Sequence, residues 1–514
     1  MSVKKRFIVS LFTSVLRAVV SFATGLVVAR GLSPTGYGDI TFLLGSFAAI
    51  RALLDMGSSS AFYTFIAQYQ RSIKFYLFYY CWLALQFLIT LLLVTVILPA
   101  KMIDTIWLGH STSIVVLALC ASFMQQSVWT TVIQIGESSR NTIKIQFANL
   151  AVMIAHLIIV SIMYIQGWLS VFNVLGVLVI EYILATVFSV WLLKASKTEV
   201  TLRNFQPNEM LLEYWRFCKP LIAMSVVAFA YQFLDRWFLQ KFGGAEQQGY
   251  YQISAQFAAV SLLVTSSVTH IFWKEMAEAS GKQDKQRMAY LYNRASRGLL
   301  MVAAVIACFL MPWAQQIVKV LLGASYADAW PVLALMFFYP IHQSMGQVNA
   351  TMFMASDQTK VYTIIGVWGM AVSIPATYFL LAPAHGMFIS GLDLGALGLA
   401  IKMIGESVIF VNIQTWKIAC VNGWRYEWKY QVIGIMSLLC LGYLVKALLC
   451  LLMPMSCYST DKQTFLLAIF SAGLVYAIGV IAFFWFWPSI AGFERQEMRH
   501  LMIKVNSTLH RISG

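Results

Sequence analysis

The chain has 514 residues, of which 60% are hydrophobic and only 11% are charged. A soluble domain carries about 25% charged residues, and the apolar residues here lie in runs of twenty or more, the length that spans a bilayer. The 36 Lys and Arg residues against 21 Asp and Glu residues leave a net charge of +15. These proportions exclude a soluble enzyme, a disulfide scaffold and a disordered protein. They predict an all-α integral membrane protein.

In chain order, breaks that contain charged residues, glycine or proline separate about fourteen apolar segments. The first segment follows Lys4, Lys5 and Arg6 and is too long for the core of a signal peptide, so we expect it to be a retained helix. The expected spans are 7–30, 39–62, 75–99, 112–134, 145–167, 170–194, 217–241, 249–273, 297–322, 328–354, 360–383, 392–416, 430–453 and 464–490.

The basic residues orient these spans. With a cytoplasmic N-terminus, 26 Lys and Arg residues fall in cytoplasmic segments and 5 on the opposite side. Because cytoplasmic loops carry the excess of Lys and Arg in membrane proteins, this bias predicts that both termini are cytoplasmic. Most of the net charge of +15 is therefore explained by topology.

A short motif occurs twice, as GLSPTGY at 31–37 after the first expected span and as GAEQQGY at 244–250 after the seventh. The offset between the two copies also places the first span on the seventh, which predicts two six-helix lobes in a parallel repeat with two extra C-terminal helices. The expected domains are an N-terminal lobe at 1–194, a cytoplasmic linker at 195–216, a C-terminal lobe at 217–416, helices 13 and 14 within 417–490, and a basic amphipathic cytoplasmic tail at 491–514.

A few charged residues fall inside the expected spans, where each costs about 2.5–3.5 kcal/mol on insertion scales. Such residues normally pair, face a water-filled cavity or carry function. The basic ones are Arg17, Arg51, Arg236, Lys402 and Lys446, and the acidic ones are Asp55, Glu181, Asp235 and Glu406.

Mutual neutralisation is the structural alternative for several of these charges. Arg51 and Asp55 are four residues apart, as are Lys402 and Glu406, so each pair lies on one helix face. Arg17 has no acid within a turn of its own helix, so its partner must lie elsewhere.

Asp235 fits either an ion or proton site or a salt bridge that holds the lobes together, and Arg236 beside it points to another helix face. His156, His270 and His342 are scattered singly, and hydrogen-bonded packing is the favoured interpretation for each, with a proton relay as the alternative. The sequence contains no nucleophile constellation, phosphate-binding loop, metal cluster or nucleic-acid motif. We therefore expect no catalytic residue, no metal and no nucleic-acid partner.

Three stretches resemble a known family. Residues 29–38 (ARGLSPTGYG) are similar to the ARxLGPxxYG turn after the first helix of polysaccharide-lipid flippases. Residues 53–57 (LLDMG) resemble their LxDxG stretch, and residues 321–330 (LLGASYADAW) resemble their LLFGxxYxxA element. The chain thus resembles the polysaccharide transporter branch (Wzx-like O-antigen flippases) of the multidrug/oligosaccharidyl-lipid/polysaccharide (MOP) exporter superfamily.

The resemblance implies a non-enzymatic flippase of the bacterial inner membrane. Its substrate would be an undecaprenyl-pyrophosphate-linked oligosaccharide, moved from the inner to the outer leaflet by alternating access among membrane lipids, with glycan polymerase or assembly proteins as further partners. By the same resemblance, Arg17 and Arg51 would bind the pyrophosphate, and we add Lys402 as a third headgroup residue.

The resemblance also bears on coupling. Asp235 matches an acid that helps bind sodium in related lipid II flippases, but span 360–383 has no carboxylate to match a second ligand. Coupling to H⁺ or Na⁺ stays open, and no cofactor is expected. The candidates for coupling or gating are Asp55, Glu181, Asp235, Arg236 and Glu406.

Three alternatives remain. A small-cation antiporter of the multidrug branch would need a net acidic cavity, whereas three of the deep charges proposed here are basic. A membrane glycan polymerase or ligase would typically carry a large outer loop, and the longest loop expected on that side has about a dozen residues around 100–111. A passive scaffold in a glycan assembly complex would tolerate the loss of its deep charges.

Overall fold

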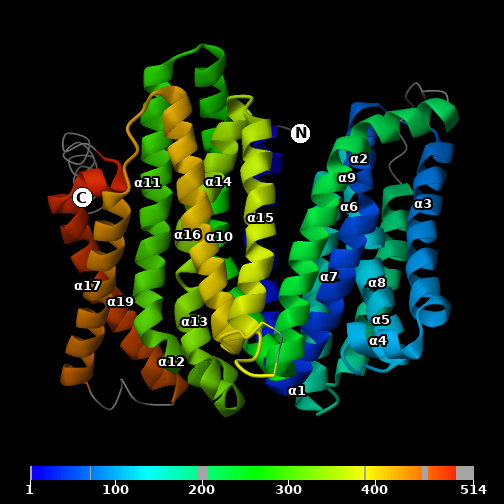
Figure 1. Ribbon diagram of the computed structural model, residues 1–514, viewed down its shortest axis with the longest axis horizontal. Helices are drawn as coiled ribbons and strands as arrows, with labels where there is room; N and C mark the ends of the chain where they lie inside the picture. Colours follow the sequence, from blue (N-terminus) through cyan, green and yellow to red (C-terminus); the bar gives the residue numbers. More distant parts are fainter. Residues whose placement is uncertain (1–2, 70, 195–206, 387–388, 454–460, 494–514) are drawn as a thin grey trace, which may run out of the picture. The chain divides into compact units, whose positions relative to one another are not determined.

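The computed structural model describes residues 3–69, 71–194, 207–386, 389–453 and 461–493, and within these ranges it contains helices and no strand (Figure 1). Short π- and 3-10 segments (η) extend or interrupt several α-helices. The elements are α1 (Val3–Asp55), α2 (Ser58–Gln68), α3 (Ile73–Leu92), η1 (Leu93–Ile97), α4 (Ala100–Ile106), α5 (Thr112–Phe123), η2 (Met124–Trp129), α6 (Thr130–Ser138), α7 (Thr142–Ile165), α8 (Val171–Lys194), α9 (Pro207–Phe238), η3 (Leu239–Gly243), α10 (Gly244–Gly281), α11 (Lys285–Leu310), η4 (Met311–Trp313), α12 (Ala314–Ile317), η5 (Val318–Leu322), η6 (Ala324–Ala329), α13 (Trp330–Met336), α14 (Tyr339–Ala355), α15 (Thr359–Leu381), α16 (Gly395–Asn422), α17 (Lys429–Leu452), α19 (Lys462–Phe486) and η7 (Pro488–Ala491).

Eleven helical stretches of the described residues are long and apolar enough to cross a membrane. The predicted all-α membrane protein is therefore confirmed, whereas the expected count of about fourteen spans is not. The first two expected spans lie together in α1, and the seventh and eighth lie in one continuous helical stretch, Asn208–Leu262. The expected span 328–354 is divided between α13 and α14.

Helix α1 shows why such spans merge. A straight helix of its 53 residues would be about 80 Å long, whereas the hydrocarbon core of a bilayer is about 30 Å thick. The backbone leaves the helical region at Ser33 (φ 63°, ψ 171°), immediately before Pro34. Figure 1 shows the chain turning there, so that the start of α1 and α2 lie at the same end. The two halves of α1 thus correspond to the first two expected spans.

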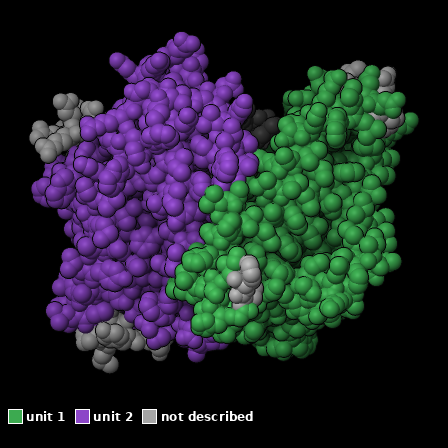
Figure 2. Space-filling view, viewed as in Figure 1, with its two compact units in different colours: residues 1–253, 370–399 green, residues 254–369, 400–514 purple. Residues whose placement is uncertain are grey.

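The chain forms two compact units (Figure 2). Unit 1 comprises residues 1–253 and 370–399, and unit 2 comprises residues 254–369 and 400–514. The six-helix lobes stay a prediction. Of the expected linker, residues 207–216 form the start of α9, while 195–206 lie outside the described residues, as does the tail from 494 onward.

The two copies of the repeated glycine motif pack against each other inside unit 1. A Cβ atom added to Gly38 would lie 1.8 Å from the carbonyl oxygen of Ala245, and one added to Gly249 would lie 2.1 Å from the carbonyl oxygen of Pro34. Backbone contact this close requires glycine, as at other helix crossings in membranes. The repeat therefore has a packing function that its spacing alone did not reveal.

This contact predicts a large difference between two glycine substitutions. We expect Gly38→Ala to lower the unfolding temperature in detergent, because overpacking costs about 1–3 kcal/mol and here the obstacle is backbone. Gly176→Ala, in α8 of the same unit, is the control, since its Cβ would meet nothing within 4 Å. Equal unfolding temperatures for the two variants would contradict the close packing.

An aromatic core lies where α2, α3 and α9 meet in unit 1. Phe62 stacks on Tyr79 with ring centroids 4.0 Å apart, and Tyr214 of α9 meets Phe65 edge to face. Arg71 packs on the edge of this core, with its guanidinium 4.9 Å from the Phe75 ring centroid. The core fixes the start of α9 against the hairpin of α2 and α3.

Candidate functional site

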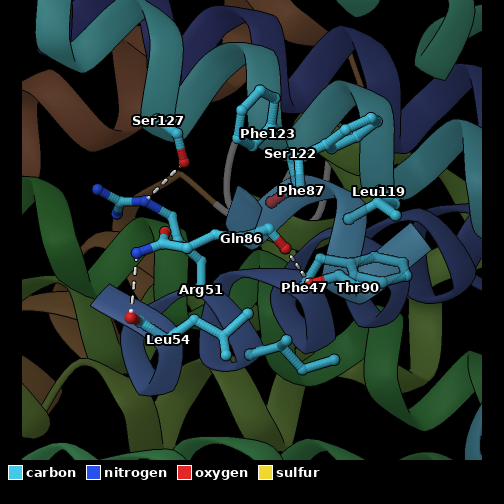
Figure 3. Close-up of a pocket in the computed structure, with 11 residues that line it drawn as sticks. Phe47, Arg51, Leu54, Gln86, Phe87, Thr90, Leu119, Ser122, Phe123 and Ser127 are labelled. Carbon is cyan, nitrogen blue, oxygen red and sulfur yellow. Dashed lines mark hydrogen bonds between the residues drawn. The ribbon is translucent and has the colours of Figure 1, made fainter. Parts of the chain in front are cut away.

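Arg51, in the second half of α1, lines a small, mostly apolar pocket in unit 1 that also contains a few polar side chains (Figure 3). Its Nε donates to Ser127 Oγ of η2 at 3.1 Å. Among the described residues, no protein acceptor binds its two terminal Nη groups, so these donors stay available. The pocket has a volume of about 30 Å³, enough for one or two water molecules. Its polar lining residues come from α1, α3, α5 and η2 and are Arg51, Gln86, Thr90, Ser122 and Ser127.

Gln86 holds the opposite wall of this pocket. Its amide donates to the Leu54 carbonyl at 3.1 Å, and its own backbone carbonyl accepts from Thr90 Oγ1 at 2.9 Å (Figure 3). The first of these bonds ties α3 to the end of α1 beside Arg51, whereas the second lies within α3. The pocket is too small for a pyrophosphate in this conformation, so an anion of that size needs the surrounding helices to separate.

Arg17 lies in the first half of α1 and is half-buried. One of its terminal nitrogens donates to Ser14 Oγ at 2.9 Å, one turn earlier on the same helix. Its Nε is buried and has no hydrogen-bond partner in the described part of the chain. An unsatisfied buried donor is costly, so Arg17 has the capacity to bind a further acceptor.

The acid that acts on Arg17 is Glu137, near the end of α6, whose carboxylate attracts the guanidinium electrostatically. Glu137 Oε1 accepts from Gln146 Nε2 at 2.7 Å, and its Oε2 lies 3.5 Å from the Tyr63 hydroxyl. Sequence reasoning expected a partner for Arg17 on another helix but did not identify Glu137. The available signal was a lone carboxylate three residues beyond the expected span 112–134.

Asp55 does not pair with Arg51 in the described residues, although the spacing allowed that alternative. Its Oδ1 accepts from the Ser58 hydroxyl at 2.9 Å and from the Ser59 backbone N–H at 3.0 Å. Gly57, at φ 84°, turns the chain between α1 and α2. Asp55 therefore caps the start of α2, satisfying a backbone donor that no helical carbonyl reaches.

Asp235 and Arg236 contact different neighbours in unit 1. Thr377 of α15 donates its hydroxyl to Asp235 Oδ1 at 2.6 Å. Arg236 Nη1 donates to the Gly45 carbonyl of α1 at 3.0 Å, and a Cβ on Gly45 would lie 2.7 Å from the Arg236 side chain. The expected span 360–383 contains no carboxylate, and Thr377 of that span contacts Asp235 through its neutral hydroxyl.

Glu181 of α8 pairs with His156 of α7, a contact that the sequence did not suggest. Nδ1 of the imidazole lies 2.6 Å from Glu181 Oε2. Both side chains are largely shielded, with 17% of His156 and 9% of Glu181 exposed. Glu181 is therefore one half of a histidine–carboxylate dyad.

Lys402 and Glu406 belong to unit 2 and form the intrahelical ion pair that their spacing predicts, with Nζ and Oε2 3.3 Å apart. The Lys402 side chain is only 2% exposed, whereas that of Glu406 is 20% exposed. The headgroup role of Lys402 stays a prediction.

A further charged contact joins His110, in the loop between α4 and α5, to Asp39 of α1. His110 Nε2 is 3.2 Å from Asp39 Oδ1, and the same oxygen accepts from Gln240 Nε2 at 2.9 Å. The hydrogen bond to Asp39 is the main cause that raises the pKa of His110 above its ordinary value of 6.5, against the opposing effect of burial. Asp39 was not among the expected site residues.

This raised pKa predicts a pH-dependent stability. The folded state binds the His110 proton more tightly than the unfolded state, so the contribution is complete below pH 6.5 and is lost as pH rises through the folded pKa. We expect the unfolding temperature of the wild type to fall more between pH 6 and pH 8 than that of His110→Gln. His385→Gln, at an exposed histidine, is expected to keep the wild-type slope. The same slope in His110→Gln would contradict the contact.

A family model shows to which protein family the chain belongs. The model of the polysaccharide biosynthesis protein family matches residues 27–331, which is more than half of the sequence. The chain belongs to this family. The predicted family resemblance is thereby confirmed, while no curated protein matches the chain.

The fold of this family member is also found in solved structures. The structure titled "Lipid II flippase MurJ, inward closed conformation" superimposes with a TM-score of 0.68 at 14% identity, covering 93% of this chain and 99% of that one. An inward-facing multidrug resistance MATE family transporter of the MOP superfamily gives a TM-score of 0.59 at 16% identity, covering 79% and 96%. A MOP superfamily transporter from Pyrococcus furiosus gives 0.51 at 14% identity, covering 81% and 94%. These superpositions show that the chain shares its fold with these proteins.

Proposed function

We propose that this polysaccharide biosynthesis protein is a flippase that moves a polyprenyl-pyrophosphate-linked oligosaccharide from the inner to the outer leaflet of the bacterial inner membrane. The family relationship and the transporter fold support a protein that translocates a glycan intermediate. The observation that carries the proposal is Arg51, in a membrane-spanning helix beside a small pocket, whose two terminal nitrogens have no acceptor among the described residues.

A pyrophosphate needs such donors when it leaves water. Its charge is costly in a medium of low dielectric constant unless hydrogen-bonded cations accompany it. A guanidinium offers a planar fork of donors that fits phosphoryl oxygens, and such charge-assisted bonds are stronger than neutral ones. Within the part of the chain that the structure describes, Arg51 keeps two of these donors free and Arg17 has a buried Nε without an acceptor. In this proposal both arginines hold the headgroup during alternating access, while the polyprenyl chain stays in lipid.

The test is translocation of the lipid-linked oligosaccharide of the producing strain in proteoliposomes, followed by cleavage of the outward-facing glycan with an added hydrolase. We expect protein-dependent exposure of the glycan. A small-molecule antiporter of the multidrug branch would instead give drug resistance on expression without any glycan phenotype, and a polymerase or ligase would lengthen or transfer the glycan. Either of these results without translocation would contradict the proposal.

A further inference from the structure

The His156–Glu181 dyad lies near the middle of the membrane-spanning part of two adjacent helices. His156 is fourteen residues from the start of α7 and nine from its end, or about 21 Å and 14 Å at a rise of 1.5 Å per residue. Glu181 is ten residues from the start of α8 and thirteen from its end, about 15 Å and 20 Å. Both ionisable groups are therefore far from either aqueous end of their helices.

The charge of the dyad depends on a single proton. With a neutral imidazole and an ionised carboxylate it carries one negative charge, and binding one proton makes it neutral, whichever group holds that proton. A medium of low dielectric constant favours the neutral form. Glu181 Oε1 adds to this preference, because it is buried and accepts no hydrogen bond within the described residues.

The charged side chains on the neighbouring helices interact with other residues, so they do not neutralise the negative charge of the dyad in place of the proton. α1, α5, α6 and η2 pack against α7 or α8, and Tyr182 is the titratable neighbour on which Glu181 acts directly, its hydroxyl accepting from Gln125 at 3.1 Å. The charged groups of these packed elements have other contacts: Arg17 with Ser14 and Glu137, Arg51 with Ser127, Asp55 with Ser58 and Ser59, Asp39 with His110, and Glu137 with Gln146. Arg30, Lys144 and Tyr164 lie near helix ends, Tyr37 follows the bend of α1, and Cys120 of α5 is a half-buried thiol.

We propose that His156 and Glu181 form a proton-binding site that couples transport to the proton gradient. The dyad takes up one proton from the outer side and becomes neutral. It then releases that proton to the cytoplasm, and glycan export runs in the opposite direction. One proton per cycle allows a gradient of one pH unit to sustain about a tenfold excess of substrate in the outer leaflet. The coupling role rests on the proposed function, whereas proton binding by the dyad does not.

Proton binding is tested on the purified protein without any substrate. Infrared difference spectra between pH 5 and pH 8, with labelled histidine, report imidazole and carboxyl bands. We expect Glu181→Gln and His156→Gln each to remove the bands of the replaced group and to change those of its partner, because the two share one proton. His342→Gln is the matched control: His342 of α14 is also a buried histidine, but it faces the neutral Gln431 amide at 3.2 Å, so the dyad bands should persist.

Coupling is tested in proteoliposomes that carry the lipid-linked oligosaccharide of the producing strain and an imposed pH gradient. We expect the gradient to drive accumulation in the wild type and in His342→Gln, while Glu181→Gln and His156→Gln equilibrate the substrate without a response to the gradient. A wild-type gradient response in both dyad variants, or unchanged infrared bands in both, would overturn the inference. Absence of translocation by the wild type under every gradient would refute the proposed function, and the infrared result would still decide proton binding. Unfolding temperatures of all variants exclude loss of the fold as the cause.

Discussion

Replacing Arg51 by glutamine should reduce glycan export by about 10- to 100-fold while the protein remains folded. A hydrogen bond to a charged group contributes about 1.5–3 kcal/mol, and no described residue occupies the two Nη donors of Arg51, which leaves them for a phosphoryl group. Arg51→Lys keeps the positive charge but loses the planar fork, so we expect intermediate export. The measurement is the initial rate of translocation per folded protein in proteoliposomes.

The controls separate headgroup binding from general charge effects. Arg216→Gln removes an exposed arginine near the start of α9 and should leave export unchanged. Arg17→Gln should also lower export, because the Arg17 guanidinium has a buried donor without an acceptor. Wild-type export by both Arg51→Gln and Arg17→Gln, at normal protein levels, would show that these arginines do not hold the headgroup.

Local spacing predicted those parts of the site that lie on one helix. The Lys402–Glu406 pair forms because residues four apart share a helix face whatever the rest of the fold does. The same rule did not apply to Arg51 and Asp55, since the helix ends at Asp55 and the Asp55 carboxylate turns to the serines that begin α2. A spacing rule holds only while the helix continues.

Contacts between helices could not be predicted from one sequence. His156 and Glu181 lie on separate helices, and nothing in their apolar surroundings indicates which faces of α7 and α8 meet. Glu137 was missed because it lies beyond the end of the expected span, although α6 extends to Ser138. The glycine repeat predicted two turns correctly in place but could not reveal that Gly38 and Gly249 form one contact.

The number of membrane spans was also not predicted correctly from one sequence. Apolar runs predict where the chain can cross a membrane, but helical structure continues through the turns at both glycine motifs. The π-helical segment η3 carries α9 into α10, and only the positive φ of Gly244 marks the junction. The expected span 328–354 is broken after Met336, near Pro340, so neither piece is as long as the sequence indicated.

Breaking the Lys402–Glu406 pair should give the largest loss of stability. Glu406→Gln leaves a cation whose side chain is 2% exposed beside a neutral amide, and removal of one partner from a buried ion pair costs about 3–5 kcal/mol. The double variant Lys402→Gln, Glu406→Gln removes both charges, so we expect it to recover most of the unfolding temperature lost in Glu406→Gln. A double variant as unstable as the single one would show that the pair is not the main interaction of Lys402.

The same double variant tests the role of Lys402 in transport. If Lys402 binds the headgroup, as its position in an expected span suggested, glycan export must stay reduced in the double variant even though its stability has recovered. A wild-type export rate in that folded variant would contradict headgroup binding and leave the pair with a structural function only. Lys446→Gln is a useful comparison, because Lys446 donates to the Pro312 carbonyl at 2.6 Å and has no carboxylate partner in the described chain. Loss of its charge should cost less stability than Glu406→Gln, because no charged partner is left buried without its counter-ion.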